Sequence, residues 1–378
     1  MSKKRGNAEG SIYQREDGRW TAAYHAQGKR KYLYGSTRDE VAKKLRDIQA
    51  KIDRGEFVEP AALTVGQWLE TWLHEYAAQG VRPSTYSAYE GIVSMHLLPT
   101  LGKYKLQGLR SEHIQSWVNR KAKDGYAPAS VKRFFNVLRV ALGQAVANRL
   151  IFHNPADAVT LPKQEAKTIE CLSAEEVAAL LAVLPDSTHG RALRFVLGTG
   201  LRVAELCGLR WCDVGEESIT VNQITYTIKR NGANERITNP PKTKAGVRFI
   251  PTNTKLRALL DVQRREQRLD RVRAGSAWQG GEPGKGEQYV FATVTGEPAD
   301  RNNIARSLRA YLKRAGLKSR GVHALRHTFA TMWVQSGNDL RTLSEILGHT
   351  NVAFTMQRYV HSDTVTKRRG MEAMASLI

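Results

Sequence analysis

The segment His323-Ala324-Leu325-Arg326-His327 is the first place where residue types and spacing predict chemistry. If the segment is a helix, Arg326 and both histidines share one side and Leu325 turns to the other, toward a core. A guanidinium presents a rigid fork of donors that matches phosphate or carboxylate oxygens. The segment therefore predicts a helix face that binds an anion.

Two other interpretations of this helix stay open. Charged faces are usual on surface helices, so the side that carries Arg326 could be an ordinary solvated one. His323 and His327 also have the spacing of zinc-binding His-Glu-x-x-His helices, but the glutamate is missing and Arg326 stands beside them. The rest of the chain must decide between these interpretations.

A second guanidinium follows a break in the chain at Gly198-Thr199-Gly200. Arg202 is expected in the first turn of the helix that begins there. Glu205, three residues later, is placed to hold its guanidinium. The alternative is a surface ion pair, which this spacing commonly forms.

Three more groups come from later segments. A turn at Pro241 to Gly246 carries Lys242 and Lys244 between predicted strands at 219–228 and 248–250. A predicted helical stripe ends at Gly348, just before His349, and Tyr359 lies ten residues beyond that histidine. Taken alone, a lysine at a hairpin tip is usually just exposed, and such a tyrosine is usually a core residue.

Together these groups fit the cleavage of a phosphodiester without metal or water. Arg202 and Arg326 can offset the charge that builds on the phosphate oxygens in the transition state. Tyr359 can attack phosphorus and keep the phosphoryl group as an ester. A lysine can protonate the departing oxygen, while His323 and His349 manage the tyrosine proton.

The composition indicates an acidic partner. The chain has 378 residues, with 58 lysines and arginines against 36 acidic residues and a net charge of +22. This length predicts two or three domains. The charge favours nucleic acid over an anionic membrane, because no basic cluster lies beside an apolar helix. No membrane span or signal peptide is recognised, so a soluble intracellular protein is expected. Three cysteines are too few and too irregular for a disulfide framework.

The N-terminal region predicts a small sheet on one helix. Residues 10 to 35 alternate short β-prone runs with turns, and Thr37 to Glu40 has the pattern of a capping box that opens a helix to about Arg54. Strands fit the DNA major groove, so this sheet is a candidate DNA reader, although a solubilising minidomain has the same composition. Its proposed contacts are Arg19, Lys29, Arg30 and Lys31.

A helical region is expected between linkers at 55–62 and 154–167. Apolar spacing predicts helices at Thr64 to Tyr76 and at about 84–96, 111–123 and 130–149. The last of these carries basic residues beside an apolar stripe, which leaves DNA contact and a plain helical bundle equally open. These residues are Lys132, Arg133 and Arg139. From Leu172 onward the chain is expected to be mainly helical, with one β-rich interruption.

This combination resembles the tyrosine recombinase family, and in particular the phage-type integrases. The motifs that carry the resemblance are Gly200 to Leu206, Lys242-Thr243-Lys244, His323 to Thr328, Leu347 to Thr350 and Arg358-Tyr359. The resemblance covers nearly the whole chain and implies the multidomain tyrosine recombinase fold. Its expected parts are a three-stranded sheet with a helix that binds arm sites (1–55), an all-helical core-site-binding domain (62–160), and a mainly α catalytic domain with a small β-sheet (168–378).

The resemblance also implies roles for individual residues. The nucleophile would be Tyr359, and the activating residues would be Arg202, Lys242, His323, Arg326 and His349. Spacing to Pro251 favours Lys242 as the catalytic lysine and leaves Lys244 as a DNA contact, but a longer or shorter hairpin would exchange the two lysines. Glu205 would support Arg202, and His327 would be a structural neighbour of the site.

The implied reaction is site-specific recombination for a phage or mobile element. A 3′-phosphotyrosyl link forms, a 5′-hydroxyl is freed, and strands exchange through a Holliday junction inside a DNA-bound homotetramer, with no metal and no nucleotide cofactor. The implied partners are double-stranded DNA at core and arm attachment sites, a DNA-bending accessory protein and an excisionase. The implied location is the nucleoid in the bacterial host cytoplasm. The apolar tail after Tyr359 resembles the segment that docks on a neighbouring protomer.

Two rival activities are weighed against this one. A type IB topoisomerase shares the chemistry but relaxes DNA without site choice, and the separate N-terminal domain argues against it. A silent DNA-binding regulator would bind DNA without cutting it, yet nothing in the sequence disables the six catalytic positions.

Overall fold

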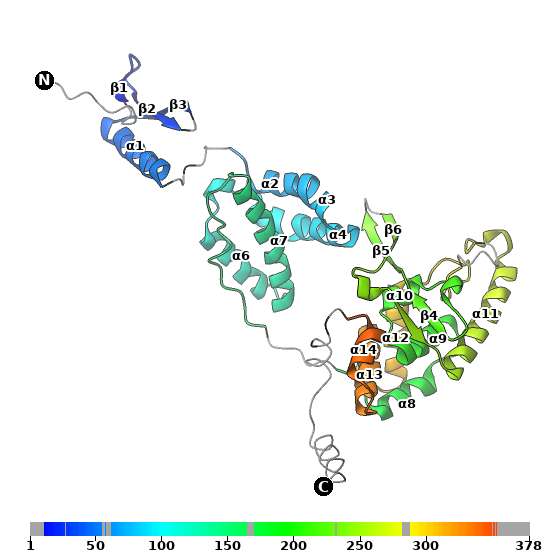
Figure 1. Cartoon of the computed structure of the whole chain (residues 1–378). Helices are drawn as coiled ribbons and strands as arrows, with labels where there is room; N and C mark the ends of the chain where they lie inside the picture. The colour runs from blue at the N-terminus through cyan, green and yellow to red at the C-terminus, as the bar shows by residue number, and fades with distance from the viewer. Residues whose placement is uncertain are drawn as a thin grey trace, which may run out of the picture. The chain divides into compact units, whose positions relative to one another are not determined.

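The computed structural model of the chain describes residues 11–26, 28–54, 57, 62–164, 170–230, 233–281, 288–349, 351 and 353 (Figure 1). The chain divides into two compact units, residues 1–165 and 166–378. Tyr359 and the apolar tail that follows it lie outside the described residues. No helix among the described residues is both long enough and apolar enough to cross a membrane.

The first unit begins with the expected sheet and helix. Strands β1 (Ser11–Gln14), β2 (Trp20–Ala26) and β3 (Lys29–Gly35) form an antiparallel sheet in that order. Helix α1 (Arg38–Asp53) packs on one face of the sheet, where its Val41 and Leu45 meet Ala22 and Tyr24 in a small core. The predicted three strands and one helix are confirmed.

The predicted capping box at the start of α1 is only half correct. The Thr37 hydroxyl accepts a hydrogen bond from the Glu40 backbone N–H, as expected. The Glu40 carboxylate instead accepts from the backbone N–H and the hydroxyl of Ser36, both at 2.9 Å. Ser36 therefore takes the place that Thr37 was expected to fill.

The rest of the first unit is helical, as predicted. Its helices surround an apolar core in which Trp68 donates from its indole nitrogen to the Ala141 carbonyl at 2.8 Å. Thr64 and Gln67 form a complete capping box at the first helix. The helices are α2 (Val65–Thr71), a π-helical segment (Trp72–Ala77), α3 (Ala78–Gly80), α4 (Pro83–Ile92), a second π-helical segment (Val93–Leu97), α5 (Leu98–Leu101), α6 (Ser111–Lys123) and α7 (Pro128–Ala147).

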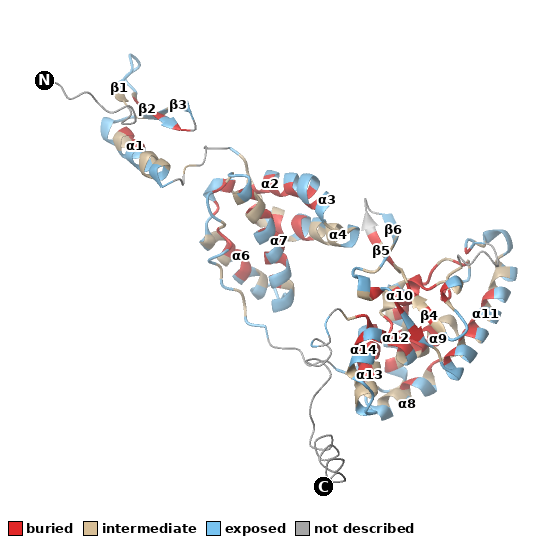
Figure 2. Ribbon diagram, viewed as in Figure 1, coloured by how far each residue is buried: buried red, intermediate tan, exposed pale blue. Residues whose placement is uncertain are grey.

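The second unit is mainly helical around one large core. Figure 2 shows buried residues gathered where α9, α10 and α12 meet, and the core includes Leu193, Phe195, Phe291 and Leu325. A capping box at Ser173 opens α8, as predicted. The helices are α8 (Ala174–Val183), α9 (Thr188–Thr199), α10 (Val203–Gly208), α11 (Thr254–Ala274), α12 (Arg301–Arg314), α13 (Val322–Gln335) and α14 (Leu340–Leu347).

The strands of the second unit differ from the prediction. The single strand expected at 219–228 is two strands, β4 (Ser218–Val221) and β5 (Ile224–Arg230). Its amides explain the break, because Asn222 donates to Asp213 and Gln223 donates to the Gly208 carbonyl, each at 2.7 Å. Strand β6 (Ala233–Asn239) was not predicted, and its residues alternate between exposed and half-buried positions.

These strands form two separate antiparallel pairs. β4 pairs with β7 (Arg248–Pro251), and β5 pairs with β6. The segment that carries Lys242 therefore connects β6 to β7, which lie in different pairs. It is not the tip of a hairpin between the two strands expected from the sequence.

Candidate active site

Helix α13 buries Arg326 and His327, two residues of the side that the sequence left open as a solvated face, whereas His323 on the same side is exposed. Arg326 is 1% exposed and His327 is 6% exposed, whereas Phe329 and Trp333 on the apolar side are only partly buried. Burial of an arginine is costly unless its donors are satisfied. The solvated-face interpretation of Arg326 is therefore wrong, and its partners explain its position.

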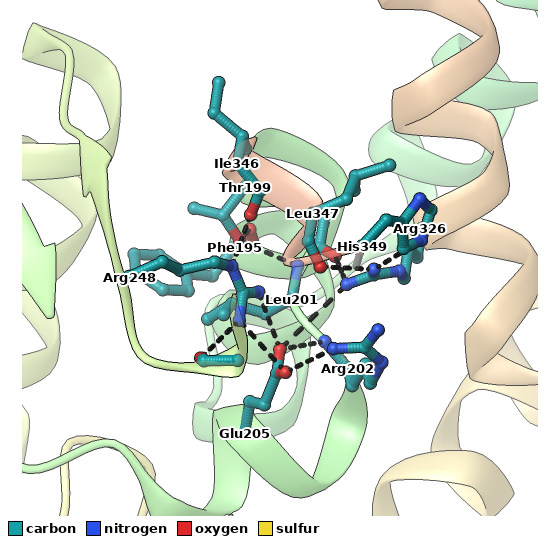
Figure 3. Close-up of polar contacts among 12 residues, drawn as sticks. Phe195, Thr199, Leu201, Arg202, Glu205, Arg248, Arg326, Ile346, Leu347 and His349 are labelled. Carbon is teal, nitrogen blue, oxygen red and sulfur yellow. Dashed lines mark hydrogen bonds and ion pairs between the residues drawn. The ribbon is translucent and has the colours of Figure 1, made fainter. Parts of the chain in front are cut away.

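Arg326 donates hydrogen bonds to the C-terminal ends of two other helices, α9 and α14 (Figure 3). Its Nη1 donates to the Gly200 carbonyl at 2.8 Å, and its Nη2 donates to the Leu347 carbonyl at 2.6 Å. The same Nη2 lies 3.1 Å from His349 Nε2. One guanidinium thus caps the last turns of α9 and α14 and touches a predicted catalytic imidazole.

Glycines make this arrangement possible. Gly200 ends α9 with φ +67°, and Gly348 ends α14 with φ +65°, a left-handed conformation that favours glycine. A Cβ on Gly200 would lie 2.6 Å from Phe329 Cδ1. The two chain breaks read from the sequence are therefore the helix ends that Arg326 caps, and at Gly200 a side chain would collide with a neighbouring one.

Arg202 and Glu205 are joined as the sequence predicted. Arg202 is the N-cap residue before α10 rather than part of its first turn, where the sequence analysis expected it. The Glu205 carboxylate accepts from the Arg202 backbone N–H at 2.9 Å and from its Nη1 at 2.7 Å. The Glu205 side chain is 2% exposed, whereas that of Arg202 is 39% exposed. Glu205 is thus a buried anchor for a guanidinium that still reaches solvent.

Arg248 is a site residue that the sequence did not indicate. Its Nη1 and Nη2 donate to both oxygens of Glu205 at 3.1 and 2.9 Å, and its side chain is 6% exposed (Figure 3). Burial alone would raise the pKa of Glu205. The hydrogen bonds and charge of Arg248, with the charges of Arg202 and Arg326, outweigh burial and hold that pKa below its ordinary value.

A cavity of about 430 Å³ opens over this cluster. It brings together Arg202, Lys242 and His349 from three distant segments. Arg326 lies beneath it, in contact with His349. The residues that line it are Arg202, Ala204, Glu205, Ile224, Pro241, Lys242, Thr243, Gly246, Gly348, His349 and Asn351.

Lys244 and His323, like Arg326, are not among the residues that line this cavity. Lys244 begins a short 3-10 turn, Lys244–Gly246, and is exposed. His323, in the first turn of α13, is exposed, and its ring meets that of His327 edge to face at 4.4 Å. No group of three histidine, cysteine or acidic side chains suited to a metal ion is found among the residues that the structure describes.

The predicted DNA contacts of the N-terminal sheet divide between its two faces. Arg30 lies 5.6 Å from the Tyr32 ring, on the face opposite the core. Lys31 lies 5.8 Å from the Phe57 ring, a residue of the core on the helix side. Lys29 has the same strand parity as Lys31, and Arg19 pairs with Asp17 at 2.8 Å. Arg30 is therefore on the open face of the sheet, whereas Lys29 and Lys31 are on the helix side.

That open face also carries tyrosines that the sequence analysis did not single out. Tyr13, Tyr32 and Tyr34 are 43, 44 and 49% exposed, and Arg15 lies 5.9 Å from the Tyr34 ring. The alternation of lysine, arginine and tyrosine along β3 could have indicated which residues share a face. We refer to Tyr13, Arg15, Arg30, Tyr32 and Tyr34 as the tyrosine face.

The basic residues of α7 also differ from one another. Lys132 and Arg133 are exposed near its N-terminal end. Arg139 donates from its Nε to Asp157 at 2.9 Å, so part of its charge is already balanced. The apolar stripe of this helix is buried, as the sequence predicted.

Family models match both units. The model described as the phage integrase family matches residues 170–365. The model described as the phage integrase N-terminal SAM-like domain matches residues 64–122. The first of these spans contains all six predicted catalytic positions.

Whole-chain relatives agree with these matches. A tyrosine recombinase XerC-like protein of Caldanaerobacter subterraneus subsp. tengcongensis is 30% identical over 362 residues, which cover 92% of each chain. The Tn1549 transposon integrase in complex with transposon right end DNA shares the fold with a TM-score of 0.68 at 22% identity, over 83% of this chain and 100% of that one. The lambda integrase tetramer bound to a Holliday junction shares it with a TM-score of 0.58 at 20% identity, over 94% of this chain and 97% of that one. The chain therefore belongs to the phage integrase family of tyrosine recombinases.

Proposed function

We propose that this chain cuts and rejoins DNA at the attachment sites of a phage or other mobile element, with Tyr359 as the nucleophile. The observation that carries the proposal is the cavity in which Arg202, Lys242 and His349 meet above Arg326. Excess positive charge in a cavity, with donors held in place, suits a phosphate whose charge grows in the transition state.

Each side chain has a separate task in the proposed reaction. Tyr359 Oη bonds to phosphorus, the bond from phosphorus to the 5′ oxygen breaks, and that oxygen takes a proton from Lys242. The tyrosine proton passes to His323 or His349. Arg202 and His349 donate to the non-bridging oxygens, and Arg326 contributes its charge from below while it orients His349. Rejoining is the reverse reaction with a different 5′-hydroxyl.

The proposed assembly is a homotetramer on DNA. The lambda integrase tetramer on a Holliday junction has the same fold and aligns with 94% of this chain. In the first unit, the tyrosine face would bind arm sites and the helical part would bind core sites. Lys132 and Arg133 are the exposed cations on α7 for the second task.

The proposal is tested by trapping the covalent intermediate. The DNA that flanks the gene supplies an attachment site, and a nick next to the cleavage position lets a short fragment diffuse away so that the protein stays attached. An adduct is expected with and without a chelator, and Tyr359→Phe should abolish it. Tyr311→Phe makes the same chemical change in the partly buried core of the second unit and should leave the adduct intact.

A second assay separates this function from its rivals. A supercoiled plasmid without attachment sites should stay supercoiled, because cleavage is expected only at those sites. Efficient relaxation would indicate a type IB topoisomerase activity instead. DNA binding without any adduct on the nicked site would indicate a silent regulator.

A further inference from the structure

Arg248 lies below the cavity yet contacts three of the segments that form it. Its guanidinium donates four hydrogen bonds. Two go to the Glu205 carboxylate, one goes from Nη1 to the Gly246 carbonyl at 3.0 Å, and one goes from Nε to the Ile346 carbonyl. An arginine has five N–H donors, so nearly all are used. Its side chain is 6% exposed, and it is not among the residues that line the cavity.

Each of these contacts leads to one cavity residue. Glu205 also holds the Arg202 guanidinium at 2.7 Å. Gly246 lies four residues after Lys242 in the same connecting segment. Ile346 lies three residues before His349, in the last turn of α14. Arg248 is thus linked to Arg202 through the Glu205 carboxylate, and to Lys242 and His349 through the backbone of the segments that carry them.

The contact with α14 is also a steric one. A Cβ on Gly348 would lie 2.8 Å from the Ala245 carbonyl and 3.1 Å from both Cδ and Nη1 of Arg248. Only glycine lets the end of α14 approach the guanidinium this closely. The position of His349, the next residue, is therefore tied to the position of the Arg248 side chain.

No other side chain could satisfy these contacts. A planar guanidinium directs its donors in three directions at fixed angles, whereas an ammonium is a single point on a flexible stem. A lysine at this position could face Glu205, but it could not also bind the Gly246 and Ile346 carbonyls in the same way. The geometry therefore selects arginine for its shape as well as its charge.

We propose that Arg248 is a positioning residue for recombination, which holds Arg202, Lys242 and His349 around one phosphate through Glu205, Gly246 and Ile346. This inference rests on the proposed function, because it assigns Arg248 to the same reaction. Arg248 touches none of the reacting atoms. Its loss should therefore misplace Lys242 rather than remove any catalytic group.

The test uses a substrate whose leaving group needs no proton. Replacing the departing 5′ oxygen of the nicked attachment site by sulfur makes the leaving group a thiolate, which departs without a general acid. A variant that misplaces Lys242 should be slow on the oxygen substrate and recover on the sulfur substrate. Lys242→Ala provides the reference for full loss of the general acid.

Single-turnover cleavage at saturating DNA is measured for the full-length protein on both substrates. Arg248→Met is expected to be about a hundredfold slower on oxygen and to recover at least tenfold on sulfur, because a displacement near 1 Å has about this effect on rate. Arg248→Lys keeps a positive charge opposite Glu205, so it should fold even if Arg248→Met does not. Its cleavage rate should fall less on the oxygen substrate and should likewise recover on the sulfur substrate. Arg191→Met removes another buried arginine, 4% exposed and outside the cavity, and should match wild type on both substrates.

The outcomes separate the inference from the proposed function. Equal slowing of the Arg248 variants on oxygen and sulfur would mean that Lys242 keeps its position in these variants, and it would overturn the positioning of Lys242 by Arg248. Wild-type rates for both Arg248 variants would overturn it as well. Absence of any adduct from the wild-type protein on either substrate would instead overturn the proposed function and the role of Arg248 with it.

Discussion

At the scale of single residues, the site is organised around one buried carboxylate. Glu205 lies within 4.0 Å of Arg202, Arg248 and Arg326, so three positive charges face one negative charge. Two of the three guanidinium groups are buried, and only Arg202 reaches solvent substantially. The cluster is left with an excess of positive charge beneath the cavity, which a bound phosphate would offset.

The charge state of Glu205 predicts how stability depends on pH. In the wild-type protein its pKa lies below the ordinary value, so its stabilising contribution is complete above about pH 4.3 and is lost only as pH falls further. Arg248→Met removes the main positive charge that opposes the effect of burial, so burial then raises the pKa of Glu205. A buried carboxylate without this partner destabilises the fold, and it does so most at high pH, where it is ionised. The variant should lose about 3 to 5 kcal/mol at pH 8.

Thermal melts at several pH values measure this effect. The gap in Tm between wild type and Arg248→Met should narrow as pH falls from 8 to 5.5, because protonation of Glu205 relieves the variant. For the double variant Glu205→Gln with Arg248→Met, the difference in Tm from wild type should be smaller than for Arg248→Met alone and should not depend on pH. If the difference in Tm between wild type and Arg248→Met does not change with pH, Arg248 does not determine the pKa of Glu205.

Gly200 gives a second prediction for a single position. Gly200→Ala meets both a left-handed backbone and Phe329, whereas Gly316→Ala has nearly the same φ, +70°, with no atom within 4 Å of the new Cβ. Gly316→Ala should cost about 1 to 2 kcal/mol of unfolding free energy. Gly200→Ala should cost about 1 to 3 kcal/mol more, from overpacking. Equal losses in urea unfolding would contradict the close packing around Gly200.

The sequence predicted some of these residues and missed others for physical reasons. Arg202 and Glu205 are local partners, three residues apart, so their contact follows from the capping geometry at the start of α10. Arg248 bonds to Glu205, 43 residues earlier, and to Ile346, 98 residues later. No local pattern marks such an arginine, because the contacts that bury it exist only in the folded chain.

At the scale of elements, polar side chains explain where the prediction of strands was wrong. Asn222 and Gln223 lie inside a β-prone run but bond to neighbouring segments, which ends β4 and lets β5 leave in another direction. β6 carries Asn234, Glu235 and Arg236, which have little strand propensity on their own. Its pairing with β5 overrides that preference. The helices were easier to predict because caps and apolar spacing are local signals.

The N-terminal sheet gives a prediction at this scale. Because side chains alternate between faces, Arg30 lies on the tyrosine face and Lys31 on the helix side. Arg30→Ala should weaken binding of the full-length protein to arm-site DNA and reduce the salt slope of log K by about 0.9. Lys31→Ala should leave that slope unchanged. Binding measured between about 50 and 200 mM salt separates the two. A larger effect from Lys31 would mean that the other face contacts DNA.

At the scale of the whole molecule, the net charge suits a long anionic partner. The net charge of +22 is spread over both units, with exposed cations on β3 and α7 in the first and arginines beneath the cavity in the second. Such a distribution steers DNA at long range but does not choose a site. The choice of site therefore belongs to particular contacts, and we propose the tyrosine face as one of them.

Assembly gives a prediction for the whole chain. On a four-way junction built from core attachment sites, four protomers should bind each junction. The mass of the complex, measured in solution for the Tyr359→Phe variant so that no strand is cut, should equal four chains plus the DNA. A stable complex of two chains at saturating protein would contradict the proposed tetramer.

The most direct measurement for the central claim is the chemical identity of the covalent link. The adduct formed on the nicked attachment site is digested with protease and nuclease, and the modified peptide is sequenced by mass spectrometry. If Tyr359 is the nucleophile, this peptide carries a nucleotide joined through its 3′-phosphate to Tyr359, and the released strand has a free 5′-hydroxyl. A link to any other residue, or through a 5′-phosphate, would contradict the central claim.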